Sequence, residues 1–292
     1  MMQLWNIVLS VLPFDWVRYD FMKTALLAVM LVSPSFGLIG TMIVGNRMAF
    51  FSDVIGHSAL TGLAIGILLG FADPRPVMVV FAILLAVAIQ LFRRVTSAAA
   101  DTVIGVFFAA TIALGVALLS RGGNFSKFTV FLVGDILGVT PGETVYLALM
   151  LLIIVFFWIV AGNSITLVGI NPSLARSRGI RVILIETAFS ALVAAVVILS
   201  IRWVGILIIN SLFILPAASS RLVAGSVRRY TILSVLLSLS AGVAGLIISF
   251  YWGTACGATI VLCAAVLYLC MVAVKGGSFL KEKKMIRLIF KE

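Results

Sequence analysis

Asp53 and His57, an aspartate and the only histidine of the chain, lie four residues apart in an apolar stretch. If this stretch is helical, the two side chains are neighbours, because residues i and i+4 adjoin on one helix face. A carboxylate oxygen and a neutral imidazole nitrogen are together suitable ligands for zinc, manganese or iron ions. Such side chains are costly inside a membrane helix, which favours a transport site for a divalent cation over a hydrogen bond that only fixes packing.

The stretch around this pair predicts a helix with two different faces. Asp53 and His57 share one face with Leu60 and Ala64. A second face is a row of small residues at four-residue spacing, which is typical of helices that pack closely in membranes. The row consists of Ser58, Gly62, Gly66 and Gly70. One side of the helix is therefore expected to touch a neighbour while the other presents the carboxylate and the imidazole.

Composition places this helix in a membrane protein. Of the 292 residues, 63% are hydrophobic and 11% are charged, whereas soluble domains are about 45–50% apolar and about 25% charged. The 21 lysines and arginines outnumber the 10 acids, which the preference of basic residues for cytoplasmic loops explains better than nucleic-acid binding does. The three cysteines show no grouping typical of a structural zinc site and are interpreted as packing residues. We expect a single transmembrane domain over residues 1–292.

Nine apolar segments are long enough to cross a membrane as helices, at about 1.5 Å per residue. They are residues 23–44, 53–71, 77–92, 102–119, 144–160, 183–201, 203–222, 230–252 and 258–274. Segment 128–139 is only about half as long as a span and is expected to form a short re-entrant or interfacial helix. We therefore expect an all-α polytopic fold with eight to nine transmembrane helices. Residues 1–20 are expected to lie on the membrane surface, and residues 275–292 to form a basic cytoplasmic tail.

The charges of the predicted loops indicate the orientation. If segment 128–139 does not cross, most basic residues, Arg47 among them, fall on the side of the C-terminal tail. The positive-inside rule makes this side cytoplasmic and places the N-terminus outside. Asp53 and His57 then lie about 9–15 Å along the helix from Arg47, close to the middle of the membrane.

A short segment between two predicted spans, beginning at Asn171, also predicts a helix. Asn171 suits an N-cap, Pro172 the first helical position, and Gly179 the position that ends the helix. Leu174 and Ala175 form a small apolar face among arginines. This pattern suits an ordinary positive loop or a docking helix for a cytoplasmic partner. The residues of the predicted docking helix are Pro172, Leu174, Ala175, Arg176 and Gly179.

The predicted span 203–222 contains Asn210 and Pro216. The proline is expected to break the helix. The carbonyls that lose their partner at the proline can line a cavity. Alternatively, the span is a kinked helix with only a structural role, and both interpretations stay open. Three further acids lie near the ends of predicted helices and are interpreted as mainly structural: Asp101, Asp135 and Glu186.

Three parts of the sequence resemble the permease subunit of the metal-ion ABC importers, the zinc, manganese and iron family. They are the segment from Arg47 through the Asp-x-x-x-His pattern to Leu60, the Asp-Thr-x-x-Gly pattern at 101–105, and a C-terminal half with 204–222 and the Gly-Ala-Thr pattern at 257–259. The similarity runs from about residue 21 to residue 274. The sequence departs from the family at Thr61, where a proline is common, and at 252–254, where an acidic residue is common.

The resemblance implies a type II ABC importer fold and a pore subunit without enzymatic activity. It implies a multi-pass protein of the bacterial plasma (inner) membrane with a cytoplasmic C-terminus. The implied partners are two copies of an ATPase, an external metal-binding lipoprotein or periplasmic protein, and a second permease in a homodimer or a closely related heterodimer. The resemblance also implies that Asp53 and His57 meet the metal ion and that residues 172–180 dock on the ATPase. No cofactor is expected to be permanently bound, and Zn, Mn or Fe is the expected substrate.

The main alternative is a gradient-driven secondary metal transporter or a channel. The sequence contains no P-loop, so ATP hydrolysis would require a separate subunit. It also shows no obvious inverted repeat and few intramembrane acids for a proton relay, which disfavours a gradient-driven transporter.

Overall fold

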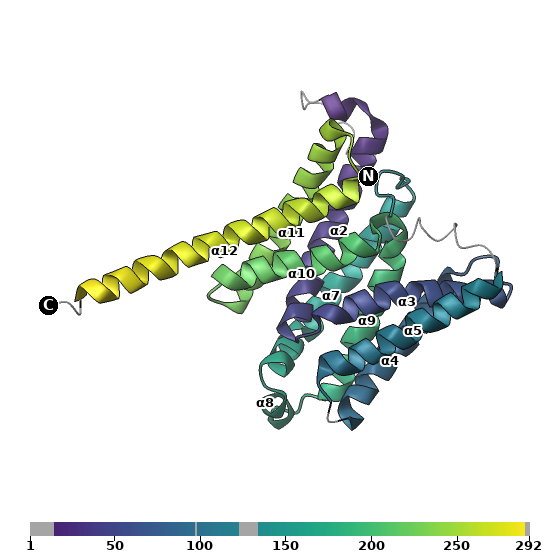
Figure 1. The fold of residues 1–292 in the computed structure, drawn as a ribbon, viewed down its shortest axis with the longest axis horizontal. Coiled ribbons are helices and arrows are strands. Elements are labelled where there is room, and N and C mark those ends of the chain that lie inside the picture. Colours follow the sequence, from purple (N-terminus) through teal and green to yellow (C-terminus); the bar gives the residue numbers. More distant parts are fainter. Residues whose placement is uncertain (1–14, 97, 123–133, 290–292) are drawn as a thin grey trace.

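The computed structural model describes residues 15–96, 98–122 and 134–289, which form helices joined by short connections (Figure 1). In chain order the elements are η1 (Asp15–Arg18), α2 (Asp20–Gly45), α3 (Ala49–Leu68), α4 (Arg75–Val95), α5 (Ala100–Gly122), α7 (Glu143–Ile170), α8 (Pro172–Ser177), α9 (Val182–Val204), α10 (Ile206–Val223), α11 (Val227–Trp252) and α12 (Cys256–Ile289). None of the described residues forms a strand. The predicted all-α fold is therefore confirmed.

Eight of the helices in the described ranges are long and apolar enough to cross a membrane. They are α2, α3, α4, α5, α7, α9, α11 and α12, and a shorter apolar helix, Ile208–Val223 within α10, is the ninth candidate. This agrees with the predicted eight to nine spans. The C-terminal end differs from the prediction, because α12 continues as one helix to Ile289 and extends away from the other helices (Figure 1). Residues 275–289 are therefore helical and continuous with the last span.

Two predicted segments lie partly outside the described residues. The interfacial segment 1–20 is described from η1 onward. The re-entrant helix 128–139 is described only over residues 134–139, which form a turn. In this turn the carboxylate of Asp135 accepts a hydrogen bond from the backbone N–H of Gly138 at 2.9 Å, which supports the structural interpretation of this acid.

Helix α2 packs against α7, α10 and α11, and small residues set its contact with α11. A Cβ atom added at Gly37 would lie 2.8 Å from the Cα of Val235, so the two backbones are in close contact. The hydroxyl of Ser234 donates to the carbonyl of Gly37 at 2.8 Å, and the hydroxyl of Ser238 donates to the carbonyl of Ser33 at 2.8 Å. Close approach and interhelical hydrogen bonds of this kind hold membrane helices together, where apolar surface gains little by leaving lipid.

Helix α3 packs against α4, α5, α9 and α10, and α4 packs in turn against α9. The α4–α9 contact contains a buried hydrogen bond of 2.5 Å from the amide of Gln90 to the hydroxyl of Ser190. Arg94 and Glu186 form an ion pair across the same two helices. Glu186 therefore has a structural partner, as its sequence position predicted.

The connections between helices show that successive spans run in alternating directions. Residues from the α2–α3 and α10–α11 connections and from the last turn of α7 line one common cavity, so these parts lie at one end of the molecule. At the opposite ends of α7 and α9, the guanidinium of Arg202 lies 3.3 Å from the carboxylate of Glu143. The backbone N–H of Asp135 donates to the carbonyl of Arg202 at 3.2 Å. The start of α7 and the end of α9 therefore lie at the same end of the molecule.

Candidate functional site

A tight turn between α2 and α3 positions the Asp–His pair. Arg47 in this turn has a φ of 56°, which lies in the left-handed region that few residues other than glycine adopt. The carbonyl of Met42 near the end of α2 accepts two hydrogen bonds from Asn46, one from its side-chain amide at 2.7 Å and one from its backbone N–H at 3.0 Å. The chain reverses within these few residues, and Asp53 and His57 follow in the second and third turns of α3.

Asp53 and His57 adjoin on the surface of α3, as their spacing predicted. Nε2 of His57 lies 3.5 Å from Oδ1 of Asp53. This distance is long for an N–H···O hydrogen bond. Solvent reaches 38% of the Asp53 side chain and 29% of the His57 side chain. The pair is therefore neither tightly bonded nor sealed in a core, and an ion can reach both groups.

Asn210 on α10 contacts the same carboxylate from the facing helix. Its Nδ2 donates to Oδ1 of Asp53 at 2.5 Å. The amide has to present its nitrogen here, because an ionised carboxylate only accepts hydrogen bonds. The amide oxygen of Asn210 is then buried and has no hydrogen-bond partner among the described residues. An unpaired buried acceptor is unfavourable, and a water molecule or a cation is the kind of group that would relieve it.

Helix α5 contributes an aromatic ring to the other side of the pair. The ring of Phe108 meets the imidazole of His57 edge to face, with ring centres 5.5 Å apart. Leu60 is half-buried on the same face of α3, whereas Ala64, predicted to share this face, is buried. The open part of the face is thus shorter than predicted and lies between α5 and α10.

The opposite face of α3 is the close-packing surface that its small residues predicted. A Cβ atom at Gly62 would lie 2.8 Å from the Cα of Met78, and one at Gly66 would lie 2.8 Å from the Cβ of Pro74. Gly70 does not belong to this surface, because no atom lies within 4 Å of its ideal Cβ position. Its φ of 76° instead allows the left-handed turn that follows α3.

Thr61, which stands where the metal-ion ABC permeases commonly have a proline, links α3 to α5 by a hydrogen bond. Its hydroxyl is buried and donates to the carbonyl of Thr111 at 2.6 Å. On the same face of α5, a Cβ atom at Gly115 would lie 2.5 Å from the Thr61 hydroxyl oxygen. The threonine therefore fixes the spacing between the helix that carries the pair and the helix that carries Phe108.

The short helix α8 forms as its capping residues predicted. The side chain of Asn171 accepts hydrogen bonds from the backbone N–H groups of Ser173 at 3.0 Å and Leu174 at 3.1 Å. Pro172 is the first helical residue, and Gly179 has a φ of 76° just after the helix. Figure 1 shows α8 at the end of the molecule opposite η1.

The predicted apolar face of α8 is divided in the structure. Ala175 is fully buried and packs in a small cluster with Val168 of α7 and Val182 of α9. Leu174 is exposed over 43% of its surface, and Arg176 is exposed as well. Ala175 therefore anchors the helix to the membrane domain, and Leu174 is the apolar residue that remains available to a partner.

Pro216 does not break α10, which is continuous from Ile206 to Val223. Proline lacks a backbone N–H, so the carbonyl four residues before Pro216 receives no hydrogen bond from it. The helix nevertheless continues past the proline. The hydroxyls after the proline bond to their own helix: Ser219 donates to the carbonyl of Leu215 at 2.7 Å. The predicted break is therefore wrong, and α10 carries Asn210 within one continuous helix.

Among the described residues, no group of three or more His, Cys, Asp or Glu side chains could hold a metal ion. The cysteines of these residues are free thiols spread along α12. One chain therefore offers a carboxylate and an imidazole, with an amide oxygen nearby. The contacts of Asn210 and Phe108 with the pair were not predicted, although Asn210 was already conspicuous as an amide in an otherwise apolar span.

Comparison with known proteins shows similarity along nearly the whole chain. The model of the ABC 3 transport family matches residues 18–275. The high-affinity zinc uptake system membrane protein ZnuB of Haemophilus influenzae is 30% identical over 255 residues, which cover 86% of this chain and 96% of that protein. The manganese import system permease protein ScaB of Streptococcus gordonii is 28% identical over 256 residues, which cover 86% of this chain and 90% of that protein.

The fold is similar to a solved structure as well. PsaBC from Streptococcus pneumoniae in complex with Fab contains a chain that matches with a TM-score of 0.74 and 25% sequence identity, over 93% of this chain and 95% of that one. Sequence and fold thus agree over all the membrane helices, including the helix that carries the Asp–His pair. The chain belongs to the ABC 3 transport family and is a permease subunit of the metal-ion ABC importers.

Proposed function

We propose that this protein is the membrane-spanning subunit of an ATP-driven importer and that divalent Zn, Mn or Fe ions pass Asp53 and His57 on their way through it. The observation that carries the proposal is the partly open carboxylate–imidazole pair on an apolar helix, facing Asn210. Relatives named for zinc uptake and for manganese import support this class of substrate. The proposal includes a bacterial plasma membrane location with the C-terminus in the cytoplasm.

The chemistry of the pair suits an ion that must be bound and then released. Carboxylate oxygen and neutral imidazole nitrogen bind zinc at about 2.0–2.2 Å. If the amide of Asn210 turns, its buried oxygen becomes a third donor. Two or three ligands from one chain leave open positions for water, or for the same pair in a second copy of the permease. A pathway requires such incomplete coordination, because a fully closed site would retain the ion.

Asn210→Ala is expected to lower metal uptake by about tenfold, because it removes a hydrogen bond to a charged group and a nearby oxygen donor. Asn210→Asp is expected to bind the ion more tightly and to release it more slowly, because it adds a negative charge beside Asp53. Uptake of radioactive zinc or manganese, resolved into KM and kcat, tests both variants. Ser219→Ala, which removes a hydroxyl from the same helix away from the pair, is the control. Wild-type kinetics in both Asn210 variants would exclude this residue from the pathway.

We further propose that α8 docks on the cytoplasmic ATPase and that two ATPase subunits act on a permease dimer. The exposed side chain of Leu174 offers an apolar contact, and the neighbouring arginines suit an acidic surface. The anchoring of Ala175 between α7 and α9 would transmit movement of α8 to both helices. An external metal-binding protein would deliver the ion on the opposite side.

Leu174→Glu is expected to weaken association with the ATPase at least about tenfold while the permease stays folded in the membrane, because only an exposed contact is lost. Ala175→Glu is expected to reduce the amount of folded permease itself, because it places a charge in a closed apolar cluster. Co-purification of the ATPase, normalised to folded permease, separates the two effects. Arg18→Glu, an exposed change in η1 at the other end of the molecule, is the control. Normal co-purification of Leu174→Glu would rule out this docking contact.

The energy source is tested by counting ions in vesicles that contain the permease and its ATPase. Elemental analysis is expected to show zinc, manganese or iron accumulating only when ATP is supplied on the ATPase side. The same measurement identifies the ion. Accumulation that follows an ion gradient without ATP would contradict the proposal and favour a secondary transporter.

A further inference from the structure

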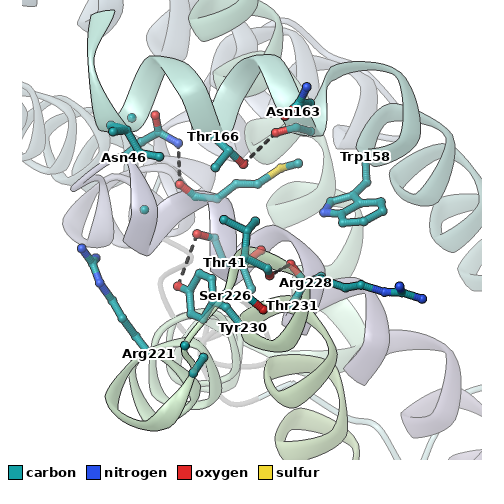
Figure 2. Close-up of a pocket in the computed structure, with 18 of the residues that line it drawn as sticks. Thr41, Asn46, Trp158, Asn163, Thr166, Arg221, Ser226, Arg228, Tyr230 and Thr231 are labelled. Carbon is teal, nitrogen blue, oxygen red and sulfur yellow. Dashed lines mark hydrogen bonds between the residues drawn. The ribbon is translucent and has the colours of Figure 1, made fainter.

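A cavity of about 830 Å³ lies away from the Asp–His pair, at the ends of α2 and α7 and the start of α11 (Figure 2). It is lined by the last two turns of α2, the last part of α7 and the α10–α11 connection. Its volume falls within the range of about 300–1,000 Å³ that is usual for small-molecule sites. Neither the Asp53–His57 pair nor its neighbours Phe108 and Asn210 line this cavity. Only its assignment to the cytoplasmic side rests on the proposed function.

The cavity lining is strongly basic. It includes Arg47, Arg221 and Arg228 and contains no acidic residue. None of the three arginines forms an ion pair within the described part of the chain. Arg221 is held in place, because its guanidinium donates to the carbonyl of Val44 at 3.1 Å. Figure 2 shows Arg221 and Arg228 on opposite sides of the cavity, with their side chains extending away from each other, so positive charge lies at two places on its rim.

Polar and aromatic groups line the cavity between the arginines. Asn163 on α7 offers an exposed amide, and the hydroxyl of Tyr230 lies 3.4 Å from the carbonyl of Thr41. Trp158 lies at the edge of the cavity in Figure 2, next to Asn163 on α7. Tryptophan and tyrosine side chains are enriched where membrane meets water, because each has an apolar ring and a polar tip.

The length of α7 places the cavity at the headgroup layer. The helix has 28 residues and is therefore about 42 Å long, whereas the hydrocarbon core needs about 20 residues. Every residue from Leu147 to Gly162 is apolar, and Asn163 is the first amide after them. The hydrocarbon part of α7 therefore ends near Asn163, and the rest of the helix lies among lipid headgroups or beyond them.

Apolar side chains lie next to the basic lining. Ile159 is 69% exposed and Ile170 is 72% exposed, and both belong to the cavity lining on α7. A soluble anion would leave these side chains against water. A phospholipid would cover Ile159, which precedes Asn163 on α7, with its acyl chains while its phosphate meets the arginines. The combination of three arginines, no acid and an exposed apolar edge therefore fits a lipid better than a free phosphate ion.

We propose that this cavity is a binding site for the phosphate headgroup of an anionic phospholipid in the leaflet on the arginine-rich, cytoplasmic side. The phosphate binds at the arginine-rich rim of the cavity, and the acyl chains run along α7 past Ile159. The lipid then bridges α2, α7 and α11 at the end of the molecule from which α8 extends.

Lipid binding to the full-length permease in nanodiscs and in mild detergent tests the proposal. The probes are dioleoylphosphatidylglycerol, dioleoylphosphatidylcholine and inorganic phosphate, measured by native mass spectrometry and by the thermal unfolding midpoint. We expect phosphatidylglycerol to stay bound and to raise the midpoint, and phosphatidylcholine to do neither. Arg228→Ala is expected to weaken phosphatidylglycerol binding about fivefold, the effect of one basic residue near an anionic membrane surface. Arg229→Ala removes the same charge from the next residue of α11, outside the cavity lining, and is expected to leave binding unchanged.

Several outcomes would overturn the proposal. Equal binding of the two lipids, or equal loss in Arg228→Ala and Arg229→Ala, would show only general attraction to an anionic surface. Stabilisation by inorganic phosphate alone that matches phosphatidylglycerol would assign the site to a free anion. If Arg228→Ala lost the ATPase and kept the lipid, the cavity would be a protein contact.

Discussion

Asp53→Ala and His57→Ala are each expected to lower metal uptake by more than about 100-fold, to the level of vesicles without permease. Each removes one of only two strong metal ligands that the pair contains, and loss of even an outer-shell partner of a metal ligand typically costs 10–100-fold. Both side chains are partly exposed, so neither change opens a core cavity. Uptake in reconstituted vesicles, normalised to folded permease, is the measurement. Asp20→Asn, an exposed carboxylate at the start of α2, is the control.

Asp53→Asn separates a role in transport from a role in packing. The amide keeps the shape of the side chain and can still bond to Asn210, but it has no charge and binds a cation weakly. If the pair only fixes helix packing, Asp53→Asn should keep both thermal stability and uptake. The proposed pathway predicts nearly unchanged stability with lost uptake. Wild-type uptake in Asp53→Asn would contradict the metal-ligand role of this residue.

Gly40→Ala is expected to cause a large loss of stability through the contact between α2 and α10. A Cβ atom at Gly40 would lie 2.1 Å from the carbonyl oxygen of Phe213, which is far inside van der Waals contact with backbone that cannot move alone. The rings of Phe36 and Phe213 already meet edge to face at 4.6 Å beside it. We expect a loss of about 3 kcal/mol in the free energy of unfolding, as for an overpacked core. Thermal unfolding of the purified permease measures it.

The matched control for this prediction is Gly105→Ala in α5, where no atom lies within 4 Å of the added Cβ. Alanine is favoured over glycine in a helix by up to about 1 kcal/mol, so Gly105→Ala should be neutral or slightly stabilising. Because α10 also carries Asn210, Gly40→Ala should lower metal uptake even where some protein remains folded. Equal unfolding temperatures for the two variants would show that α2 and α10 are farther apart than described.

The part of the site that could be predicted from the sequence depends on local geometry. Asp53 and His57 adjoin because four residues make about one helical turn, and the caps of α8 follow from Asn171, Pro172 and Gly179. The contact between Asp53 and Asn210 joins positions 157 residues apart. Such a contact depends on how α3 and α10 pack, and no local pattern in one sequence contains that information.

The differences from prediction have the same origin. Ala175 and Leu174 are adjacent apolar residues in sequence, but the neighbours Val168 and Val182 bury only Ala175. Pro216 was expected to break its span, but packing against α2, α11 and α12 keeps α10 continuous. Gly70 fits the four-residue spacing of the small residues on α3. It lies just beyond Leu68, the last residue of the helix, and its positive φ allows the turn that follows. Tertiary contacts decided the first two cases, and the end of α3 decided the third.

The central claim is that a transported metal ion binds between Asp53 and His57. A structure of the permease with its ATPase, solved with Mn²⁺ or Zn²⁺ present, tests this most directly through the anomalous scattering of the metal. We expect an anomalous peak about 2.0–2.2 Å from Nε2 of His57 and from a carboxylate oxygen of Asp53. The same peak should be missing in Asp53→Asn. A strong metal peak elsewhere along the helices, with no metal at this pair, would contradict the account.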